Sequence, residues 1–481
     1  MPRDYVPRAY GPGATDFLLQ LPRCNLFAGM GMGKTVITLT AIDLVYAMGE
    51  MSKPTLILGP LRVARTTWKE QAAEWSHLSS LEVNPIVGTQ QERTRAAGRD
   101  VAIHTTNYEN IPWLVSYWGN RWPYGWVVAD ESTRLKSFRG SMQTSSTGKQ
   151  FLRKAGGLRA RSMGSVAHKS ERWTNLTGTP SPNGLQDLWG QQWFVDAGAR
   201  LGRTYSSFEQ RYFRTGYNGY GIEPLPFAMP QIQDAIRDTT YTLDPEDWFD
   251  LADPIVHTIE VDLPPNARRL YRDMERDLYL QIDGRDAEAK NAASKTQKLL
   301  QLANGAIYLD HDADNDNHPK AKDWKEVHNA KLEALDSLVT EMAGATLLVA
   351  YQFRSDLDRL KRAFPAGRHI SSAMDEADLK AGRIPVAFVH PRSLGHGVDG
   401  IQHVCNTAVF FGHDWDLEDY LQIIERIGPM RQLQSGTGKA TFLYHIVARD
   451  TADEDVMLRR ETKGRVQDAF KAGFKRRNGN G

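Results

Sequence analysis

A glycine-rich stretch near the start of the chain, residues 28–35 (AGMGMGKT), has residue types that bind the phosphates of a nucleotide. Its glycines let the backbone curl, so that successive N–H groups point into one hollow at the positive end of a helix. These glycines are Gly29, Gly31 and Gly33. Lys34 could then reach the β- and γ-phosphates, and the Thr35 hydroxyl could bind Mg²⁺. The strict phosphate-loop pattern has glycine where this chain has Ala28, so a flexible loop is the competing interpretation of this stretch alone.

Two adjacent acidic residues, Asp130 and Glu131, follow an apolar run within residues 125–133 (GWVVADEST). Open α/β sheets bind ligands at the carboxyl ends of their strands. There Asp130 could hold Mg²⁺ while Glu131 orients an attacking water. Such a pair can also be a solvated loop or a helix cap. Its position downstream of a glycine-lysine-threonine loop favours the catalytic interpretation.

A third candidate lies in residues 175–184 (NLTGTPSPNG), where a short strand runs into Thr177 and Thr179. The two threonines supply hydroxyls, and Pro180 fixes the turn that follows. The sequence places no general base beside them, so a nucleophilic threonine is disfavoured. Simple strand-turn chemistry is the alternative to a functional role.

The sequence around these residues predicts alternating strands and helices. Continuous apolar runs flanked by glycine or proline predict buried parallel strands. In the first half these strands are expected at 23–28, 54–60 and 101–105, and in the second half at 346–353, 386–390, 407–411 and 441–447. Helical spacing predicts helices at 14–21 and 63–75, the latter with Trp68 and Trp75 as core residues. This alternation indicates a doubly wound α/β fold.

Composition bounds the class of protein. The chain has 481 residues, of which 41% are hydrophobic and 24% charged, as in soluble globular proteins with more than one structural unit. No apolar run approaches the length of a membrane span, and the N-terminal sequence does not resemble a signal peptide. With Cys24 and Cys405 as the only cysteines, a disulfide framework and a cysteine-based zinc site are both disfavoured. An intracellular protein is expected, and the net charge of +1 does not by itself indicate a polyanionic partner.

The order of these motifs resembles the Swi/Snf-type DNA translocases of helicase superfamily two, in a compact form like those of phages and bacteria. The resemblance covers most of the chain. Residues 28–35 are similar to the family's DEMGLGKT, and 130–133 to its DEAH box, with Ser132 and Thr133 in place of Ala and His. The matching segments further along are LTGTP at 176–180, HPRSLGHG at 390–397 and QIIERIGPMRQ at 422–432. One departure is Gly11, at a position where the family often has a glutamine that reads adenine.

The resemblance implies two RecA-like α/β lobes that bind ATP and Mg²⁺ between them, with helical insertions. The expected domains are lobe 1 at 1–200, with a basic insertion near 137–170, a helical connector at 201–325 and lobe 2 at 326–481. It also implies that Arg426 is an arginine finger, with Gly397 and Gln422 at the nucleotide. Pro429 stands where the family has a second arginine, and Arg431 is a candidate replacement. Thr177 and Thr179 would couple nucleotide to nucleic acid.

The segment from Ser132 to Ser170 is rich in lysine and arginine and has no aspartate or glutamate. This composition suits a mobile loop and helix that contact phosphates without reading bases. The predicted nucleic-acid-binding residues are Arg139, Lys149, Arg153, Lys154, Arg159 and Arg161. A solvated basic insertion is the alternative.

These motifs predict a nucleic-acid-stimulated ATPase that translocates on double-stranded DNA in the cytoplasm of a bacterium or a phage-infected host. We expect no membrane partner, and targeting that depends on DNA structure or a protein partner. One alternative is a helicase that separates DNA or RNA strands, and another is a scaffold that uses nucleotide only as a switch. The acidic run at 310–317 (DHDADNDN) predicts a polar hairpin tip rather than a calcium loop. The basic, glycine-rich tail at 471–481 predicts disorder.

Overall fold

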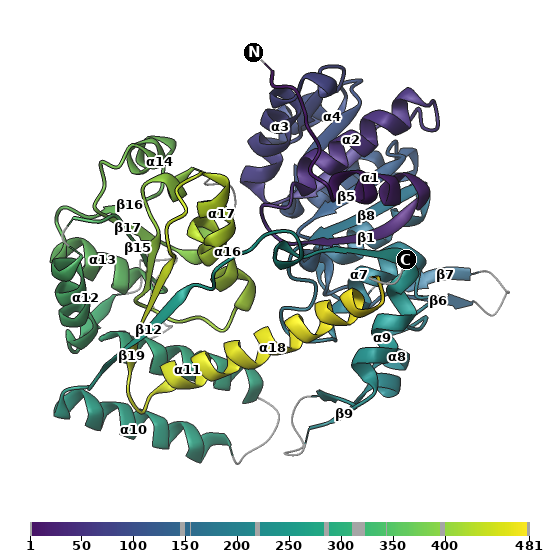
Figure 1. The fold of residues 1–481 in the computed structure, drawn as a ribbon. Coiled ribbons are helices and arrows are strands. Elements are labelled where there is room, and N and C mark those ends of the chain that lie inside the picture. Colours follow the sequence, from purple (N-terminus) through teal and green to yellow (C-terminus); the bar gives the residue numbers. More distant parts are fainter. Residues whose placement is uncertain are drawn as a thin grey trace. The chain divides into compact units, whose positions relative to one another are not determined.

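The apolar runs of the sequence become parallel strands in two separate units of the fold (Figure 1). This computed structural model describes residues 2–144, 150–153, 155–216, 222–282, 288–309, 323–342, 344–394 and 400–478. The first unit consists of residues 1–250 together with 463–481, and the second of residues 251–462. The predicted α/β class, with two parallel sheets and added helices, is confirmed.

The first unit is built on a seven-stranded sheet with the order β11-β1-β8-β5-β2-β4-β3, and every neighbouring pair is parallel. Its strands are β1 Arg23–Ala28, β2 Thr55–Gly59, β3 Val83–Pro85, β4 Ile103–Asn107, β5 Trp126–Asp130, β8 Arg172–Thr177 and β11 Thr240–Leu243. All five residues of β2 are buried, as expected of a strand covered on both faces. Because the strands are parallel, their carboxyl ends share one edge of the sheet.

Helices connect and cover these strands. They are α1 Gly11–Gln20, α2 Lys34–Ala47, α3 Trp68–Glu74, α4 Gln90–Ala97, α5 Ile111–Trp118, α6 Leu158–Gly164, α7 Asp187–Asp196, α8 Tyr205–Tyr212 and α9 Ala228–Ile236. α2 packs against α1 and α3, and α7 packs on β1 and β8. The predicted helix at 63–75 begins with a π-helical turn, Val63–Thr67, before α3. Trp68 is fully buried as predicted, whereas Trp75 is only half-buried.

The second unit has a six-stranded parallel sheet with the order β12-β19-β18-β15-β17-β16. Its strands are β12 Ile255–Val261, β15 Leu347–Ala350, β16 Arg368–His369, β17 Val386–Val389, β18 Thr407–Phe410 and β19 Phe442–Ala448. Its helices are α10 Pro265–Ile282, α11 Glu288–Asn304, α12 Ala330–Glu341, α13 Arg354–Ala363, α14 Ala373–Lys380, α15 Pro391–Leu394, α16 Leu417–Ile427 and α17 Pro429–Gln434. A two-stranded hairpin, β13 Ala306–Tyr308 and β14 Trp324–Glu326, is separate from the main sheet. The four strands predicted in the second half of the chain lie at β15, β17, β18 and β19.

The units do not divide at the predicted boundaries of 200 and 325. Residues 201–250 belong to the first unit, because β11 pairs with β1 along the edge of its sheet. Residues 251–325 belong to the second unit, because β12 pairs with β19 along its whole length. The helical connector predicted at 201–325 is therefore shared between the two units.

The C-terminal helix α18, Ala452–Asn478, contradicts the prediction of a disordered tail from residue 471. Its residues from 463 onward belong to the first unit, where Phe470 is fully buried in the core. The backbone carbonyl of Phe470 also accepts a hydrogen bond from the Gln233 amide at 2.6 Å. These long-range contacts outweigh the basic composition of the segment.

The basic segment also differs from the loop and helix that its composition predicts. It contains an antiparallel hairpin of β6 Ser141–Thr144 and β7 Gln150–Arg153, and only then α6. A bridge between Phe138 and Gly156 closes the base of this hairpin. A second hairpin, β9 Phe213–Thr215 and β10 Ile222–Pro224, lies between α8 and α9.

None of the helices in the described part of the chain combines the length and apolar character needed to cross a membrane. The acidic run at 310–317 lies outside the described residues.

Candidate functional site

Three of the predicted motifs meet at one edge of the sheet in the first unit. β8 lies between β1 and β5, and Phe27 on β1 is in register with Thr177 on β8. On the other side of β8, Asp130 pairs with Leu176. The glycine-rich loop, the acidic pair and the threonine turn therefore emerge side by side, although they are far apart in the sequence.

The glycine-rich loop between β1 and α2 depends on its glycines in two ways. Gly31 and Gly33 adopt positive φ angles of 78° and 74°, a left-handed conformation that favours glycine. Gly29 is required for space, because a Cβ atom there would lie 2.6 Å from Cδ of Pro245. Gly33 is the residue that precedes α2, so the loop delivers the next residues directly to a helix N-terminus.

Lys34 and Thr35 occupy the first turn of α2. The Lys34 ammonium group donates hydrogen bonds to the backbone carbonyls of Ala28, at 2.7 Å, and Gly29, at 3.3 Å. It therefore lies over the loop rather than in solvent. The threonine turn also lies close to this loop. A Cβ atom added to Gly178 would lie 3.3 Å from the Ala28 carbonyl oxygen and 3.8 Å from Nζ of Lys34.

Asp130 ends β5 as a half-buried residue whose carboxyl group contacts an indole. Nε1 of Trp68 donates a hydrogen bond to Oδ2 of Asp130 at 3.1 Å. Burial and the neighbouring charge of Glu131 raise the pKa of Asp130 to about 7, although Lys34 and the Trp68 hydrogen bond oppose this shift. A metal cation would offset the same burial cost, so this carboxylate is suited to holding one.

Glu131 has a positive φ of 60°, which is uncommon for a residue with a side chain. Such a conformation costs on the order of 1–3 kcal/mol and persists when the surroundings hold it. The Tyr108 hydroxyl does so by donating to the carbonyls of Asp130, at 2.8 Å, and Glu131, at 3.2 Å. The side chain of Glu131 is half-buried at the end of β5.

The turn after β8 holds the two predicted coupling threonines. Thr177 is fully buried and Thr179 is 8% exposed. The hydroxyl of Thr177 accepts a hydrogen bond from the backbone N–H of Thr179 at 3.0 Å. The hydroxyl of Thr177 therefore stabilises the turn.

Together these residues fit a triphosphate and Mg²⁺. A helix N-terminus, a lysine and backbone N–H groups favour an anion. The Thr35 hydroxyl and the Asp130 carboxyl are oxygen donors of the kind that Mg²⁺ prefers. The closeness of Gly178 to both the loop and Lys34 places the threonine turn in the same site.

Sequence reasoning assigned Trp68 to the core and did not single out Tyr108 or Gln191. Trp68 is indeed buried, and its N–H contacts Asp130 as well. Gln191, on α7, contacts the segment after Glu131 through the Ser132 hydroxyl, at 2.7 Å. A signal for Gln191 was present in the sequence, because two glutamines interrupt the otherwise apolar run WGQQWF.

The predicted nucleic-acid-binding residues do not form one group. Arg139 is engaged locally, since its Nη1 donates to the carbonyls of Lys136 and Phe138, and its guanidinium lies 3.7 Å from the centre of the Tyr205 ring. Arg159 on α6 is exposed and forms an ion pair with Glu109 at 2.8 Å, and Arg161 on the same helix is half-buried. Lys149 and Lys154 lie outside the described residues, and so does the side chain of Arg153.

The predicted residues of the second unit lie on α16 and α17. Gln422 and Arg426 are one helical turn apart on α16, and both are buried. Arg431 is half-buried on α17. Pro429 is the first residue of α17, a position where its fixed φ is favourable and its missing N–H costs nothing. Gly397 lies outside the described residues.

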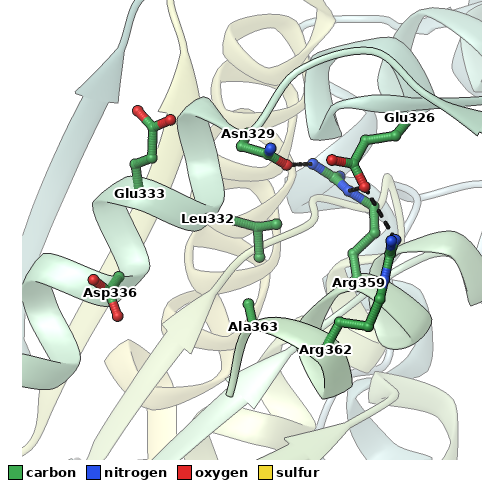
Figure 2. Close-up of a pocket in the computed structure, with 8 residues that line it drawn as sticks. All are labelled: Glu326, Asn329, Leu332, Glu333, Asp336, Arg359, Arg362 and Ala363. Carbon is green, nitrogen blue, oxygen red and sulfur yellow. Dashed lines mark hydrogen bonds and ion pairs between the residues drawn. The ribbon is translucent and has the colours of Figure 1, made fainter. Parts of the chain in front are cut away.

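A pocket of about 370 Å³ in the second unit contains none of the predicted site residues (Figure 2). It is lined by Glu326, Asn329, Leu332, Glu333, Asp336, Arg359, Arg362 and Ala363. Glu326 pairs with Arg362 at 3.0 Å and with Arg359 at 3.7 Å. Glu333 and Asp336 bring the lining to three acidic residues against two arginines, so the pocket is poorly suited to a phosphate.

Comparisons with known proteins identify the family of the chain. A model of the SNF2-related domain matches residues 20–307. The protein p41 of Acyrthosiphon pisum secondary endosymbiont phage 1 is 48% identical over 99% of this chain and 100% of its own length. Chromodomain-helicase-DNA-binding protein 1 is 21% identical in both Gallus gallus and Homo sapiens, over 92% of this chain, which spans 25% of each of those proteins.

Among solved structures, the SWI2/SNF2 ATPase core of Sulfolobus solfataricus in complex with double-stranded DNA is similar at a TM-score of 0.43 and 17% identity. The match covers 98% of this chain and 94% of that one.

Proposed function

Because the chain belongs to the SNF2-related family, we propose that it hydrolyses ATP and uses the free energy to translocate on double-stranded DNA. The observation that carries the proposal is the meeting of Lys34, Asp130 and Gly178 at the carboxyl ends of β1, β5 and β8. These ends bring a phosphate loop, an acidic pair and a threonine turn together in one site. Relatives whose names state helicase activity and DNA binding support the choice of nucleic acid.

In this proposal the first unit binds the nucleotide. The backbone of the loop, with Gly29, Gly31 and Gly33, surrounds the phosphates, and Lys34 turns from the loop carbonyls toward the β- and γ-phosphates. Thr35 and Asp130 would hold Mg²⁺, which when bound neutralises charge that develops on the phosphates. Glu131 orients the water that attacks the γ-phosphate, and its fixed backbone sets the direction of that carboxylate.

We propose that the second unit contributes Arg426, whose charge stabilises the γ-phosphate in the transition state. Gln422 and Gly397 would contact the nucleotide, and Arg431 would take the place of the second arginine that Pro429 excludes. Binding of ATP then favours the conformation in which Arg426 reaches the phosphate, and product release favours the other.

The DNA would be held through its phosphates by the basic segment, chiefly by Arg159 and Arg161 on α6 and by the hairpin before it. Arg139 is a weaker candidate, because its guanidinium already serves the local fold. We propose that the protein acts in the cytoplasm of a bacterium or a phage-infected host, as the relation to p41 suggests. A protein partner or a DNA structure would direct it to its sites of action.

The test measures ATP hydrolysis with duplex DNA, single-stranded DNA, RNA or no nucleic acid. Stimulation chiefly by duplex DNA, together with displacement of a triplex-forming strand, is expected. Lys34→Ala should abolish hydrolysis, whereas Lys53→Ala, which removes an exposed pair with Glu171, should not. Displacement of a strand from a fork would favour a strand-separating helicase instead. Hydrolysis that no nucleic acid stimulates would favour a nucleotide-switched scaffold.

A further inference from the structure

Two consecutive glutamines, Gln191 and Gln192, lie inside α7, where every residue from Asp187 to Val195 is buried. Gln191 is 1% exposed and Gln192 is 2% exposed. Burying an amide is unfavourable unless its donor and acceptor both find partners. The partners of these side chains therefore indicate what each glutamine does.

The Gln191 amide joins two of the site's segments. Its Oε1 accepts a hydrogen bond from the Ser132 hydroxyl at 2.7 Å, and its Nε2 donates to the Pro180 carbonyl at 2.7 Å. Ser132 directly follows Glu131, and Pro180 directly follows Thr179. One buried side chain thus connects the acidic pair to the threonine turn through two short hydrogen bonds.

The first residue of α7 makes a parallel connection. The Asp187 carboxylate pairs with Lys136 at 3.4 Å and accepts from the backbone N–H of Asn183 at 2.9 Å. Gly190 allows this close approach, because a Cβ atom there would lie 2.5 Å from the Lys136 carbonyl. The N-terminal half of α7 is therefore packed directly against both segments.

Gln192 has a different set of partners. Its Oε1 accepts from the Asn25 amide at 2.8 Å, and its Nε2 donates to Asp196 at 2.7 Å and more weakly to Thr239 at 3.4 Å. These contacts hold α7 against β1 and the residues before β11. They touch neither the acidic pair nor the threonine turn.

We propose that Gln191 is a positioning residue that transmits movement of the Glu131 segment to the threonine turn, and so couples ATP hydrolysis to the DNA. This inference rests on the proposed function. Glu131 is held in a backbone conformation that is unfavourable on its own, so a change at the γ-phosphate can release or restore it. Ser132 moves with Glu131, and the buried Gln191 amide, bonded to Ser132 through Oε1 and to Pro180 through Nε2, passes that displacement to Pro180. The second hydrogen bond of Nε2, to the Asp187 carbonyl at 3.0 Å, anchors the amide to its own helix.

The test compares Gln191→Leu with Gln192→Leu, which removes an equally buried amide from the next position of the same helix. The readout is the ratio of duplex-stimulated to basal ATP hydrolysis, together with triplex displacement per ATP hydrolysed. We expect the ratio to fall about tenfold in Gln191→Leu and to stay within about twofold of wild type in Gln192→Leu. Thermal unfolding of both variants measures the loss of stability that they share.

Ser132→Ala is the second variant, since it deletes the same hydrogen bond with a smaller change in volume. It should lower the stimulation ratio as Gln191→Leu does. The double variant Ser132→Ala/Gln191→Leu should have a stimulation ratio no lower than that of the single variants. Equal ratios in the Gln191→Leu and Gln192→Leu variants, or additive losses in the double variant, would overturn the inference. Wild-type protein that duplex DNA does not stimulate would overturn the proposed function as well, so the two failures are distinguishable.

Discussion

Replacing Trp68 by phenylalanine tests whether an indole N–H keeps Asp130 ready to hold Mg²⁺. The hydrogen bond from Nε1 to Oδ2 is 3.1 Å long, and the Trp68 side chain is fully buried. Phenylalanine retains an aromatic ring and loses the donor. The variant therefore removes one polar contact of Asp130 without introducing a charge.

The expected magnitude follows from that contact. A hydrogen bond to a charged group contributes about 1.5–3 kcal/mol, which corresponds to about tenfold to a hundredfold in an equilibrium constant. The Trp68 bond lowers the pKa of Asp130, which burial and Glu131 raise to about 7. Without the bond the pKa rises further, so a smaller fraction of molecules carries the carboxylate at neutral pH. We expect the Mg²⁺ concentration for half-maximal hydrolysis to increase about tenfold. This is the lower end of the range, because bound Mg²⁺ itself stabilises the carboxylate and offsets part of the loss.

Trp126→Phe is the matched control for this measurement. Trp126 is also fully buried in the first unit, and its indole N–H donates to the Thr174 hydroxyl at 3.0 Å. Both variants should lower the free energy of unfolding by about 1–3 kcal/mol, since each loses buried area and a hydrogen bond. Hydrolysis is measured in a Mg²⁺ titration at fixed ATP, with Trp126→Phe expected to follow wild type. An identical Mg²⁺ requirement in the two variants would refute the reasoning and leave Trp68 as a core residue only.

Four further outcomes are expected. Arg426→Ala should lower kcat by about a thousandfold while changing ATP binding little. Single-turnover hydrolysis and nucleotide titration measure these two quantities. A variant with a raised KM and an unchanged kcat would contradict the role of Arg426 as an arginine finger. Gly29→Ala should impair ATP binding, because its Cβ would meet Pro245 at 2.6 Å, whereas Gly464→Ala, with nothing within 4 Å, should not. The double variant Arg159→Ala/Arg161→Ala should weaken DNA binding and flatten its dependence on salt, and so should a quadruple variant that also replaces Arg153 and Lys154 by alanine. If the slope of DNA affinity against salt concentration does not change, the basic segment is not part of the interface. His104 is buried and its pKa is lowered to about 4, so the unfolded chain takes up a proton at this residue before the folded chain does as the pH falls below about 6.5. The free energy of unfolding should therefore decrease by up to about 3 kcal/mol between pH 6.5 and pH 4. Denaturant titrations measure this loss, which His104→Phe should reduce.

Much of the fold follows from local patterns. Strands such as β2 and β15 are predictable because a strand buried on both faces must be apolar throughout and must end at a breaker. The site of the first unit is predictable for a related reason. Its loop needs glycines, and its acidic pair must follow a strand, so residue type and position are both constrained.

Contacts between distant segments explain what the sequence did not predict. The tail becomes helix α18 because Phe470 is buried in the first unit's core, against Phe27 among others at a ring distance of 6.5 Å. Residues 240–243 join the first unit by pairing with β1, although the sequence predicts that they belong to a helical connector. The basic segment forms a hairpin whose base is closed by Phe138 and Gly156, and charge composition carries no information about that pairing. The second role of Trp68 likewise depends on where Asp130 lies in space.

Three unusual features gather at the carboxyl edge of the sheet in the first unit. At the carboxyl edge lie a carboxyl group with a raised pKa, a glutamate with positive φ, and a buried glutamine that joins two loops. Each of these is unfavourable for stability taken alone, and an apolar side chain in place of Gln191 would pack in the core without needing polar partners. A sheet selected only to fold would not collect such features at one edge. Their concentration where the phosphate loop begins is therefore an argument for function there that is independent of any single motif.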